Sequence, residues 1–244
     1  MITKDKPSFI MNKVAVGFGY DIINILKQEK YKISKSRINY MQTVLEKSVV
    51  FDVKYIVNEK VPLLDIHQNC YGSIEVLNIP QVIDVPPVCL NNRVVEMSPI
   101  MILDIYKIKE NTWSVLHEIC HLLTIGKYTY GDDCIYHKFG INEYEYNKTN
   151  MLLIKRDENS RMNELINDYV VWRLMETLYG HKVEPIYIGI KKFSKYLENR
   201  CKENFDENCF IGWYFSGNIP KIKKILFDIN YKSYDDILEY LIKN

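Results

Sequence analysis

The sequence is poor in the residues that build nucleotide-binding loops and disulfide-bonded scaffolds. Only 10 of its 244 residues are glycine, and neither a phosphate-binding loop nor a dinucleotide-binding glycine pattern occurs. The six cysteines include no CxxC pair, and in a chain of this size without a secretory signal we expect reduced thiols. These absences argue against nucleotide chemistry and against a disulfide framework.

Long apolar runs and an excess of charge of one sign are missing as well. No apolar run approaches the roughly 20 residues that span a bilayer, and the N-terminal stretch lacks the features of a secretory signal. The 32 basic side chains nearly balance the 31 acidic ones, which argues against a general electrostatic nucleic-acid binder. We therefore expect a cytoplasmic protein without a membrane partner and without direct contact to nucleic acid.

The pattern of apolar residues predicts an α+β fold. Hydrophobic residues make up 47% of the chain, which is enough for a substantial core, and no internal repeat or Gly/Ser linker divides it. The coarse order is helices, a small sheet and then helices again. We expect three parts that pack as one domain: an N-terminal helical segment (1–48), a core (49–180) and a helical C-terminal region (181–244).

Local spacing predicts the individual elements. Helices are expected at 20–27, 34–47, 112–125, 159–179, 190–203, 221–227 and 234–242. The second of these is expected to bury Ile38, Met41, Val44 and Leu45. Runs of β-branched and aromatic residues predict strands at 49–57, 71–79 and 93–97. Ser98-Pro99 is typical of an N-cap and a first helical turn, so we expect a short helix from there toward Tyr106. The polar, Tyr-rich stretch from Gly126 to Thr149 predicts a long loop, whereas Gly180 is expected to end a helix.

The segment His117-Glu118-Ile119-Cys120-His121 matches the pattern HExxH. Positions i and i+4 lie on one face of a helix, so both imidazoles can reach a single metal ion. Glu118 follows the first of them, where its carboxylate can contact a metal-bound water and act as a general base. Cys120 is expected to point away from the metal as a small buried residue.

A catalytic zinc ion needs a third protein ligand and an open position for water. Glu164 and Asp168 are four residues apart on a predicted helix, so one carboxylate can bind zinc while the other orients a ligand imidazole. His137 is the alternative third ligand, which its loop could bring back to the metal. His67 and His181 have no spacing argument and are expected to be ordinary polar residues.

With these residues the chain resembles the zincin metallopeptidases. The segment LHEICHLL is preceded by strands and followed by a helix with NELIND, an arrangement that is similar to the gluzincin pattern. The resemblance implies that Glu164 is the third zinc ligand and that Asp168 forms a hydrogen bond with His117. It also implies a small mixed β-sheet before the active-site helix and a mostly helical part after it. An edge strand of that sheet would bind an extended substrate, and VVEMSP (94–99) is the expected source of this strand or its neighbour.

Two related groups are similar to parts of the chain. SprT-like proteins share the order of a strand, a Ser-initiated short helix and HExxH, but they use a histidine as third ligand, which would favour His137. ImmA/IrrE-like regulatory proteases place an ExxxN-type helix downstream, close to what Glu164 to Asp168 offers, although their alanine-rich helix signature is missing here. Zincins also place a Tyr, His or Arg to stabilise an oxyanion, and the candidates here are Tyr179, His181 and Tyr214.

The leading hypothesis is a zinc metallopeptidase that acts on a peptide or protein substrate, with Glu118 as general base. The alternative is a non-catalytic zinc-binding or protein-interaction module with the same fold, because the third ligand has two candidates and no oxyanion stabiliser is convincing. A DNA-associated protease or a repressor-cleaving regulator is a third hypothesis, which the near-neutral charge does not support. The substrate, the cleavage site and the oligomeric state stay open.

Overall fold

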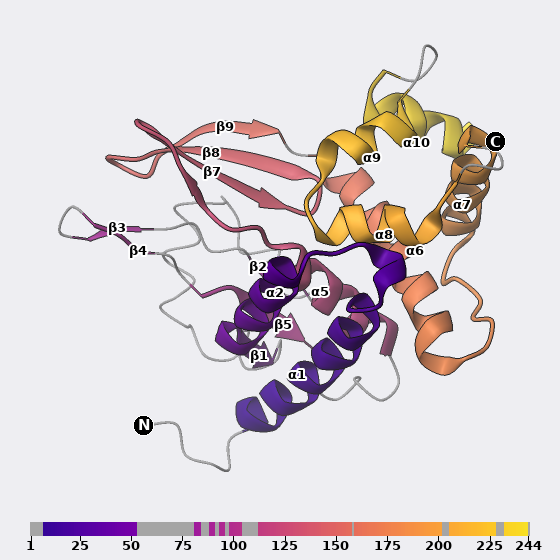
Figure 1. Ribbon diagram of the computed structural model, residues 1–244, viewed down its shortest axis with the longest axis horizontal. Helices are drawn as coiled ribbons and strands as arrows, with labels where there is room; N and C mark the ends of the chain where they lie inside the picture. Colours follow the sequence, from indigo (N-terminus) through magenta and orange to yellow (C-terminus); the bar gives the residue numbers. More distant parts are fainter. Residues whose placement is uncertain are drawn as a thin grey trace.

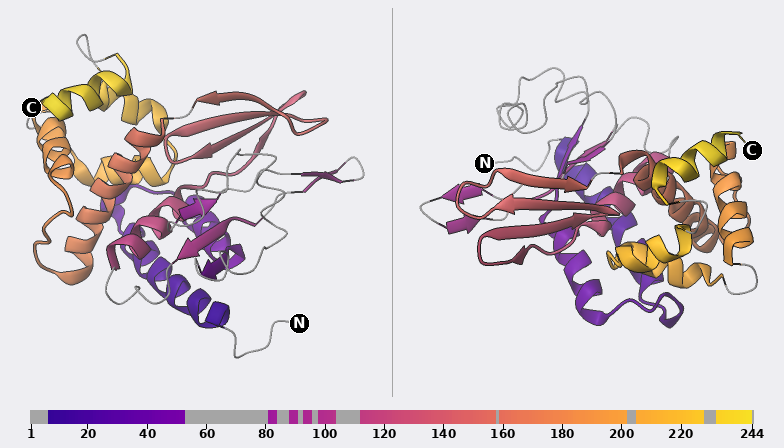
Figure 2. Two further views of the ribbon diagram at one scale, coloured as in Figure 1. Left: turned by 180° about the vertical axis from the view of Figure 1, so that it is seen from behind. Right: turned by 90° about the horizontal axis from the view of Figure 1, so that it is seen from above.

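The protein is a mixed α+β molecule in which helices pack against a three-stranded sheet, a four-stranded sheet projects outward, and a two-stranded ribbon is separate from both (Figure 1). The computed structural model describes residues 7–52, 81–83, 88–90, 93–95, 98–103, 112–157, 159–201, 205–227 and 232–243. Two further views show the projecting sheet standing away from the C-terminal helices (Figure 2). Within the described residues, the α+β class expected from the sequence is confirmed and helices predominate. A four-stranded sheet that comes between α5 (Thr112–Thr124) and α6 (Ser160–Tyr179) in the chain departs from the expected order of helices, a small sheet and helices.

The N-terminal part is helical, as predicted, but its first helix begins at Pro7 rather than at the expected position 20. Its elements are α1 (Pro7–Leu26), the 3-10 turn η1 (Glu29–Tyr31) and α2 (Lys35–Lys47). The hydroxyl of Ser34 caps α2 by accepting a hydrogen bond from the backbone N of Arg37 at 3.2 Å, which satisfies one of the free N–H groups of the first turn. The buried side of α2 is the predicted one, formed by Ile38, Met41, Val44 and Leu45.

A three-stranded mixed sheet lies next to these helices. Its strands are β1 (Val49–Asp52), β5 (Ile100–Leu103) and β2 (Gln81–Ile83). The central strand β5 is parallel to β1 and antiparallel to β2, and α5 (Thr112–Thr124) packs against both β2 and β5. Three apolar residues of this central strand, Ile100, Met101 and Ile102, are buried.

The short helix expected after Ser98-Pro99 is wrong for residues 100–103, which form β5. Pro99 instead leads into the strand, and its carbonyl accepts a hydrogen bond from the N of Val49 at 3.0 Å. Four consecutive apolar residues fit a central strand better than one turn of a helix, because two partner strands satisfy the backbone. Residues 104–106 lie outside the described part of the chain.

The predicted strands are described only in part. The strand expected at 49–57 is seen as β1 up to Asp52, the one at 71–79 lies outside the described residues, and 93–95 form β4 (Arg93–Val95). β4 pairs with β3 (Val88–Leu90) in a separate two-stranded ribbon. Within the described residues, the antiparallel edge strand next to α5 is therefore β2, whereas VVEMSP contributes to β4 and to the approach to β5.

The long loop expected between Gly126 and Thr149 is wrong, because this segment forms most of an antiparallel sheet. The strands, in their order across the sheet, are β6 (Thr129–Tyr130), β7 (Cys134–Phe139), β8 (Asn142–Asn147) and β9 (Leu153–Asp157). In β7, buried Ile135 and His137 alternate with exposed Tyr136, which is the period-2 pattern of a half-buried strand. Many residues of these strands are tyrosines and charged residues rather than aliphatic ones, so a search for apolar periodicity does not detect the strands.

The turn between β7 and β8 requires glycine at position 140. Gly140 has φ +60°, and a Cβ built there would lie 2.0 Å from Oδ1 of Asn163. The same oxygen accepts a hydrogen bond from the backbone N of Ile141 at 3.1 Å. Since Asn163 belongs to α6 (Ser160–Tyr179), this turn joins the projecting sheet to the helix that follows it.

The C-terminal helices match the predictions except for one. They are α6, α7 (Ile188–Cys201), α8 (Glu207–Phe215), α9 (Ile219–Leu226) and α10 (Tyr234–Lys243). Gly180 ends α6 with φ +70°, as expected for a C-terminal glycine. The sequence analysis missed α8, because most of its side chains are apolar and buried and no one-sided pattern marks it.

Buried side chains from all three expected parts of the chain belong to one core cluster, which includes Ile22, Leu116 and Ile237. Helix α5 lies centrally in it and packs against α1, α2 and α6. None of the described helices is both long enough and apolar enough to cross a membrane.

Candidate metal centre

Helices α5 and α6 bring three possible metal ligands together (Figure 1). Nε2 of His117 lies 2.9 Å from Oε2 of Glu164 and 3.0 Å from Nε2 of His121. Nε2 of His121 lies 3.1 Å from Oε1 of Glu164. All three groups therefore direct a donor atom at one point, with the two imidazoles on one face of α5 and the carboxylate on α6.

The spacing of the three donors suits a tetrahedral metal site. Zinc bonds to nitrogen and oxygen of about 2.0–2.1 Å place neighbouring ligand atoms about 3.3 Å apart. The closest contacts between the three side chains are 2.9, 3.0 and 3.1 Å, so only a small outward movement is needed to receive an ion. The side chain of Glu164 is 54% exposed and that of His121 only 5%, so the cluster opens to solvent on the Glu164 side. A metal ion held there would have a side open to solvent, where a catalytic metal keeps its water ligand.

Asp168 holds the first imidazole in place. Its Oδ1 lies 2.7 Å from Nδ1 of His117, which donates the hydrogen bond because the carboxylate can only accept. The same oxygen accepts from Nε1 of Trp113 at 3.2 Å, and Oδ2 accepts from the hydroxyl of Tyr187 at 2.7 Å. With the Nδ1 proton committed to Asp168, Nε2 of His117 is the ring atom available to a metal.

Contacts within the cluster shift the pKa values of His117 and Glu164. Burial of the His117 ring opposes its protonation, but the hydrogen bonds to Asp168 and Glu164 outweigh burial and raise the pKa of His117 to about 10. Burial likewise opposes ionisation of Glu164, yet hydrogen bonds with His117 and His121 hold its pKa well below the usual range. Both pKa shifts arise from the attraction between a protonated imidazole and the carboxylate. A bound cation would replace the proton on Nε2 of His117 and attract the carboxylate in its place.

Glu118 and Cys120 occupy different surroundings within the motif. Glu118 is only 6% exposed, and its charge contributes to raising the pKa of His117. Cys120 is fully buried and is not one of the three donors. Burial raises the pKa of its thiol, which fits the packing role expected for it.

Asn167 connects the backbone of the motif to α6. Its Nδ2 donates to the carbonyl oxygen of His117 at 2.9 Å, and its Oδ1 accepts from the hydroxyl of Tyr214 at 3.3 Å. Tyr214 is fully buried, and burial raises its pKa well above 10. Tyr214, one of the candidates for oxyanion stabilisation, is therefore hydrogen-bonded to Asn167, and this bond joins α8 to α6.

The other two oxyanion candidates lie far from the cluster. Tyr179 comes 15 positions after Glu164 on the same helix, which places it about 22 Å further along the axis. Its ring contacts that of His181 at a centroid distance of 6.0 Å, so both residues are at the far end of α6. The sequence analysis missed Tyr187, which does reach Asp168. No local sequence pattern indicates this contact, because the chain turns back after α6 and brings Tyr187 to Asp168.

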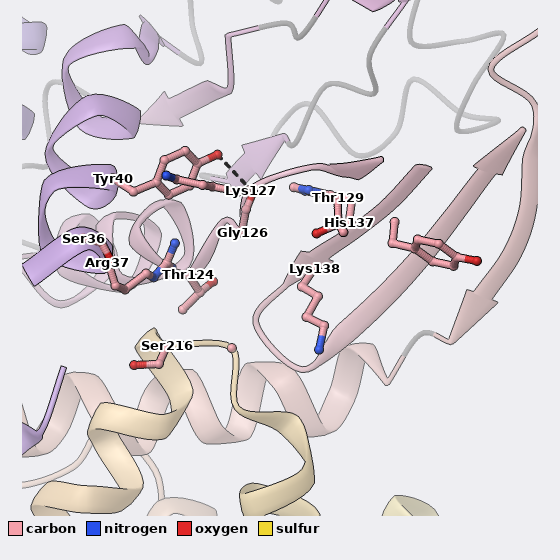
Figure 3. Close-up of a pocket in the computed structure, with 12 residues that line it drawn as sticks. Ser36, Arg37, Tyr40, Thr124, Gly126, Lys127, Thr129, His137, Lys138 and Ser216 are labelled. Carbon is pink, nitrogen blue, oxygen red and sulfur yellow. Dashed lines mark hydrogen bonds between the residues drawn. The ribbon is translucent and has the colours of Figure 1, made fainter. Parts of the chain in front are cut away.

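His137 is not part of the three-residue cluster. It lies on β7, is 1% exposed, and stacks on the ring of Tyr128 at 4.2 Å. Its ring lines a separate pocket at the C-terminal end of α5 (Figure 3). His67 lies outside the described residues.

Comparisons of the chain with protein-family models, with curated proteins and with solved structures found no match. The chemistry of the cluster must therefore be inferred from its own donor set. Two imidazoles and one carboxylate could hold a divalent cation, and this combination suits zinc as well as other metals of borderline softness.

Proposed function

We propose that the protein is a zinc-dependent metallopeptidase with a zincin-like core, which hydrolyses peptide bonds in a peptide or protein substrate. The observation that carries this proposal is the convergence of His117, His121 and Glu164 on one point that opens to solvent. A purely structural site would be closed by a fourth protein ligand, and the described residues offer only three donors here.

The residues around the cluster have separate tasks in this reaction. A bound zinc ion would lower the pKa of a water ligand to about 7 and polarise the carbonyl of the substrate. Glu118, which is buried and follows His117 in the motif, accepts the proton of the attacking water and passes it to the leaving amine. Asp168 fixes the orientation of His117 through the hydrogen bond to Nδ1.

A non-catalytic metal-binding module is the second candidate function. It is favoured by the positions of Tyr179, His181 and Tyr214, none of which the structure places as a donor at the cluster. The buried Glu118 argues against it, because a structural site has no use for a base beside its first ligand. Hydrolytic activity distinguishes the two candidates.

The metal content of purified protein tests the ligand set. We expect one zinc ion per wild-type chain after mild dialysis, measured by elemental analysis. Glu164→Ala should lose the ion, because two imidazoles alone hold zinc weakly, whereas the His137→Ala control should keep it. Loss of zinc in His137→Ala alone would contradict the proposed site, and so would a wild-type protein that cannot be loaded with zinc.

Replacement of the proposed base tests the catalytic role. Glu118→Gln keeps the size of the side chain but removes the proton acceptor, so we expect full zinc content and hydrolysis reduced about 10²- to 10⁴-fold. Cleavage of a fluorogenic peptide library is the measurement, and Glu239→Gln, on the exposed face of α10, is the matched control. Full activity in Glu118→Gln would refute the assignment. A wild type that holds zinc and cleaves no peptide would favour the non-catalytic module.

A further inference from the structure

A second pocket, separate from the proposed metal ligands, lies beyond the C-terminal end of α5 (Figure 3). It has a volume of about 380 Å³ and lies between α2, β7 and the turn after α8. This volume is within the range of pockets that hold small organic ligands. Thr124, which follows His121 by three residues on α5, belongs to its lining, but none of the three proposed metal ligands does.

The lining of this pocket is positively charged. Arg37, Lys127 and Lys138 line it, and none of its described lining residues is acidic. Lys138 forms an ion pair with Glu143 at 3.2 Å, so its charge is compensated. The ammonium group of Lys127 lies 5.1 Å from the centre of the Tyr40 ring and forms no ion pair within the described part of the chain.

Arg37 is a half-buried cation whose hydrogen-bond partners are neutral carbonyl groups. Its Nε donates to the carbonyl of Phe215 at 2.6 Å, and its two terminal nitrogens donate to the carbonyls of Ile125 and Leu123, each at 2.7 Å. Burial lowers the pKa of Arg37 to about 10. Its carbonyl partners lie at the C-terminal ends of α5 and α8, where the helix dipole favours a cation, but among the described residues no carboxylate pairs with it.

We propose that this pocket binds a small organic phosphate monoester. Within the described residues, Arg37 and Lys127 have no carboxylate partner. A dianionic phosphate would balance their two positive charges, whereas a single carboxylate would balance only one. The hydroxyl-bearing side chains of the lining, Thr129 and Ser216 among them, can donate to phosphate oxygens. The ring of Tyr40, another lining residue, provides an apolar surface for the organic part of the ligand (Figure 3).

Titration of the full chain with phenyl phosphate tests this proposal. We expect saturable binding of one molecule per chain by isothermal titration calorimetry, with benzoate and inorganic phosphate both binding more weakly. Lys127→Met should weaken the binding of phenyl phosphate about tenfold or more, whereas Lys127→Arg should retain it. Lys127 is exposed, so its replacement is not expected to disturb the fold. Lys182→Met, at another exposed position, is the matched control.

Three outcomes would overturn the proposal. One is the absence of saturable binding by phenyl phosphate, and another is unchanged affinity in Lys127→Met. Equal affinity for inorganic phosphate or for benzoate would overturn the assignment of an organic dianion.

Glu164→Ala, which should lose the metal, is expected to bind phenyl phosphate as the wild type does. This variant separates the pocket from phosphate bound at a metal ion. A bulky replacement, Ser216→Phe, should abolish binding while the zinc content and the circular dichroism spectrum stay unchanged.

Discussion

At the scale of single residues, Asp168 connects the candidate metal centre to the side chains around it. It accepts hydrogen bonds from Trp113, His117 and Tyr187, which come from three separate positions along the chain. A carboxylate held by two further donors has little freedom to turn, so it keeps the imidazole of His117 in one orientation. Such outer partners of a metal ligand typically contribute about 10- to 100-fold in metal affinity.

Tyr187→Phe tests this arrangement, because it removes one hydroxyl and keeps the ring. We expect metal affinity to fall about tenfold, measured by competition with a chromogenic chelator. Tyr179→Phe is the matched control, since Tyr179 is similarly exposed but lies at the far end of α6. Equal affinities of Tyr187→Phe and the wild type would show that Trp113 and the helix alone hold Asp168 in place.

At the scale of elements, helix α8 depends on its N-cap. Asp206 accepts hydrogen bonds from the backbone N of Cys209 at 3.0 Å and from its Sγ at 2.9 Å. Both interactions lower the pKa of Asp206. Helix α8 carries Tyr214 toward α6 and the Phe215 carbonyl toward Arg37, so its position affects the region behind the metal ligands as well as the pocket.

Asp206→Ala should destabilise the protein by about 1 kcal/mol, and Asp206→Asn by less, since asparagine is also a good cap. Urea unfolding at pH 7 is the measurement. Because the folded pKa lies below that of an unfolded aspartate (about 3.9), the charge-dependent part of the stabilisation is present above that pH. It is lost as the pH falls through the folded pKa. A difference between wild type and Asp206→Ala that grows on acidification would contradict this assignment.

At the scale of the whole molecule, the helix that carries both histidines of the candidate metal centre is part of the core. Helix α5 packs against α1, α2 and α6, and it contributes Leu116, Ile119 and Leu123 to the same cluster of buried side chains. A ligand that binds only the folded state stabilises it by about 4 kcal/mol when its concentration is 1,000 times Kd. Metal binding should therefore stabilise the fold as a whole.

Removal of the metal should lower the melting temperature of the entire chain. For a protein of this size, about 4 kcal/mol corresponds to a shift of roughly 10 °C. Scanning calorimetry with excess zinc and with a chelator is the measurement, and Glu164→Ala should show no comparable shift. A zinc-induced shift of the same size in Glu164→Ala would place the binding site elsewhere.

Features that depend on neighbours along the chain could be predicted before any tertiary contact was known. The helical period alone places His117 and His121 on one face, and Ser34 and Gly180 mark helix ends through hydrogen bonds and φ angles of their own segments. The buried side of α2 follows from the same period. These predictions needed no knowledge of what packs against each helix.

Only the tertiary structure decided which distant side chains meet. Glu164 is 43 positions after His121, and it lies at the two imidazoles because α6 packs on α5. His137 lies instead on β7, whose pairing with β8 is carried by tyrosines and charged residues rather than by an apolar pattern. The run at 100–103 is a strand because β1 and β2 flank it. Contacts of this kind are set by packing between elements, and local propensity carries no information about them.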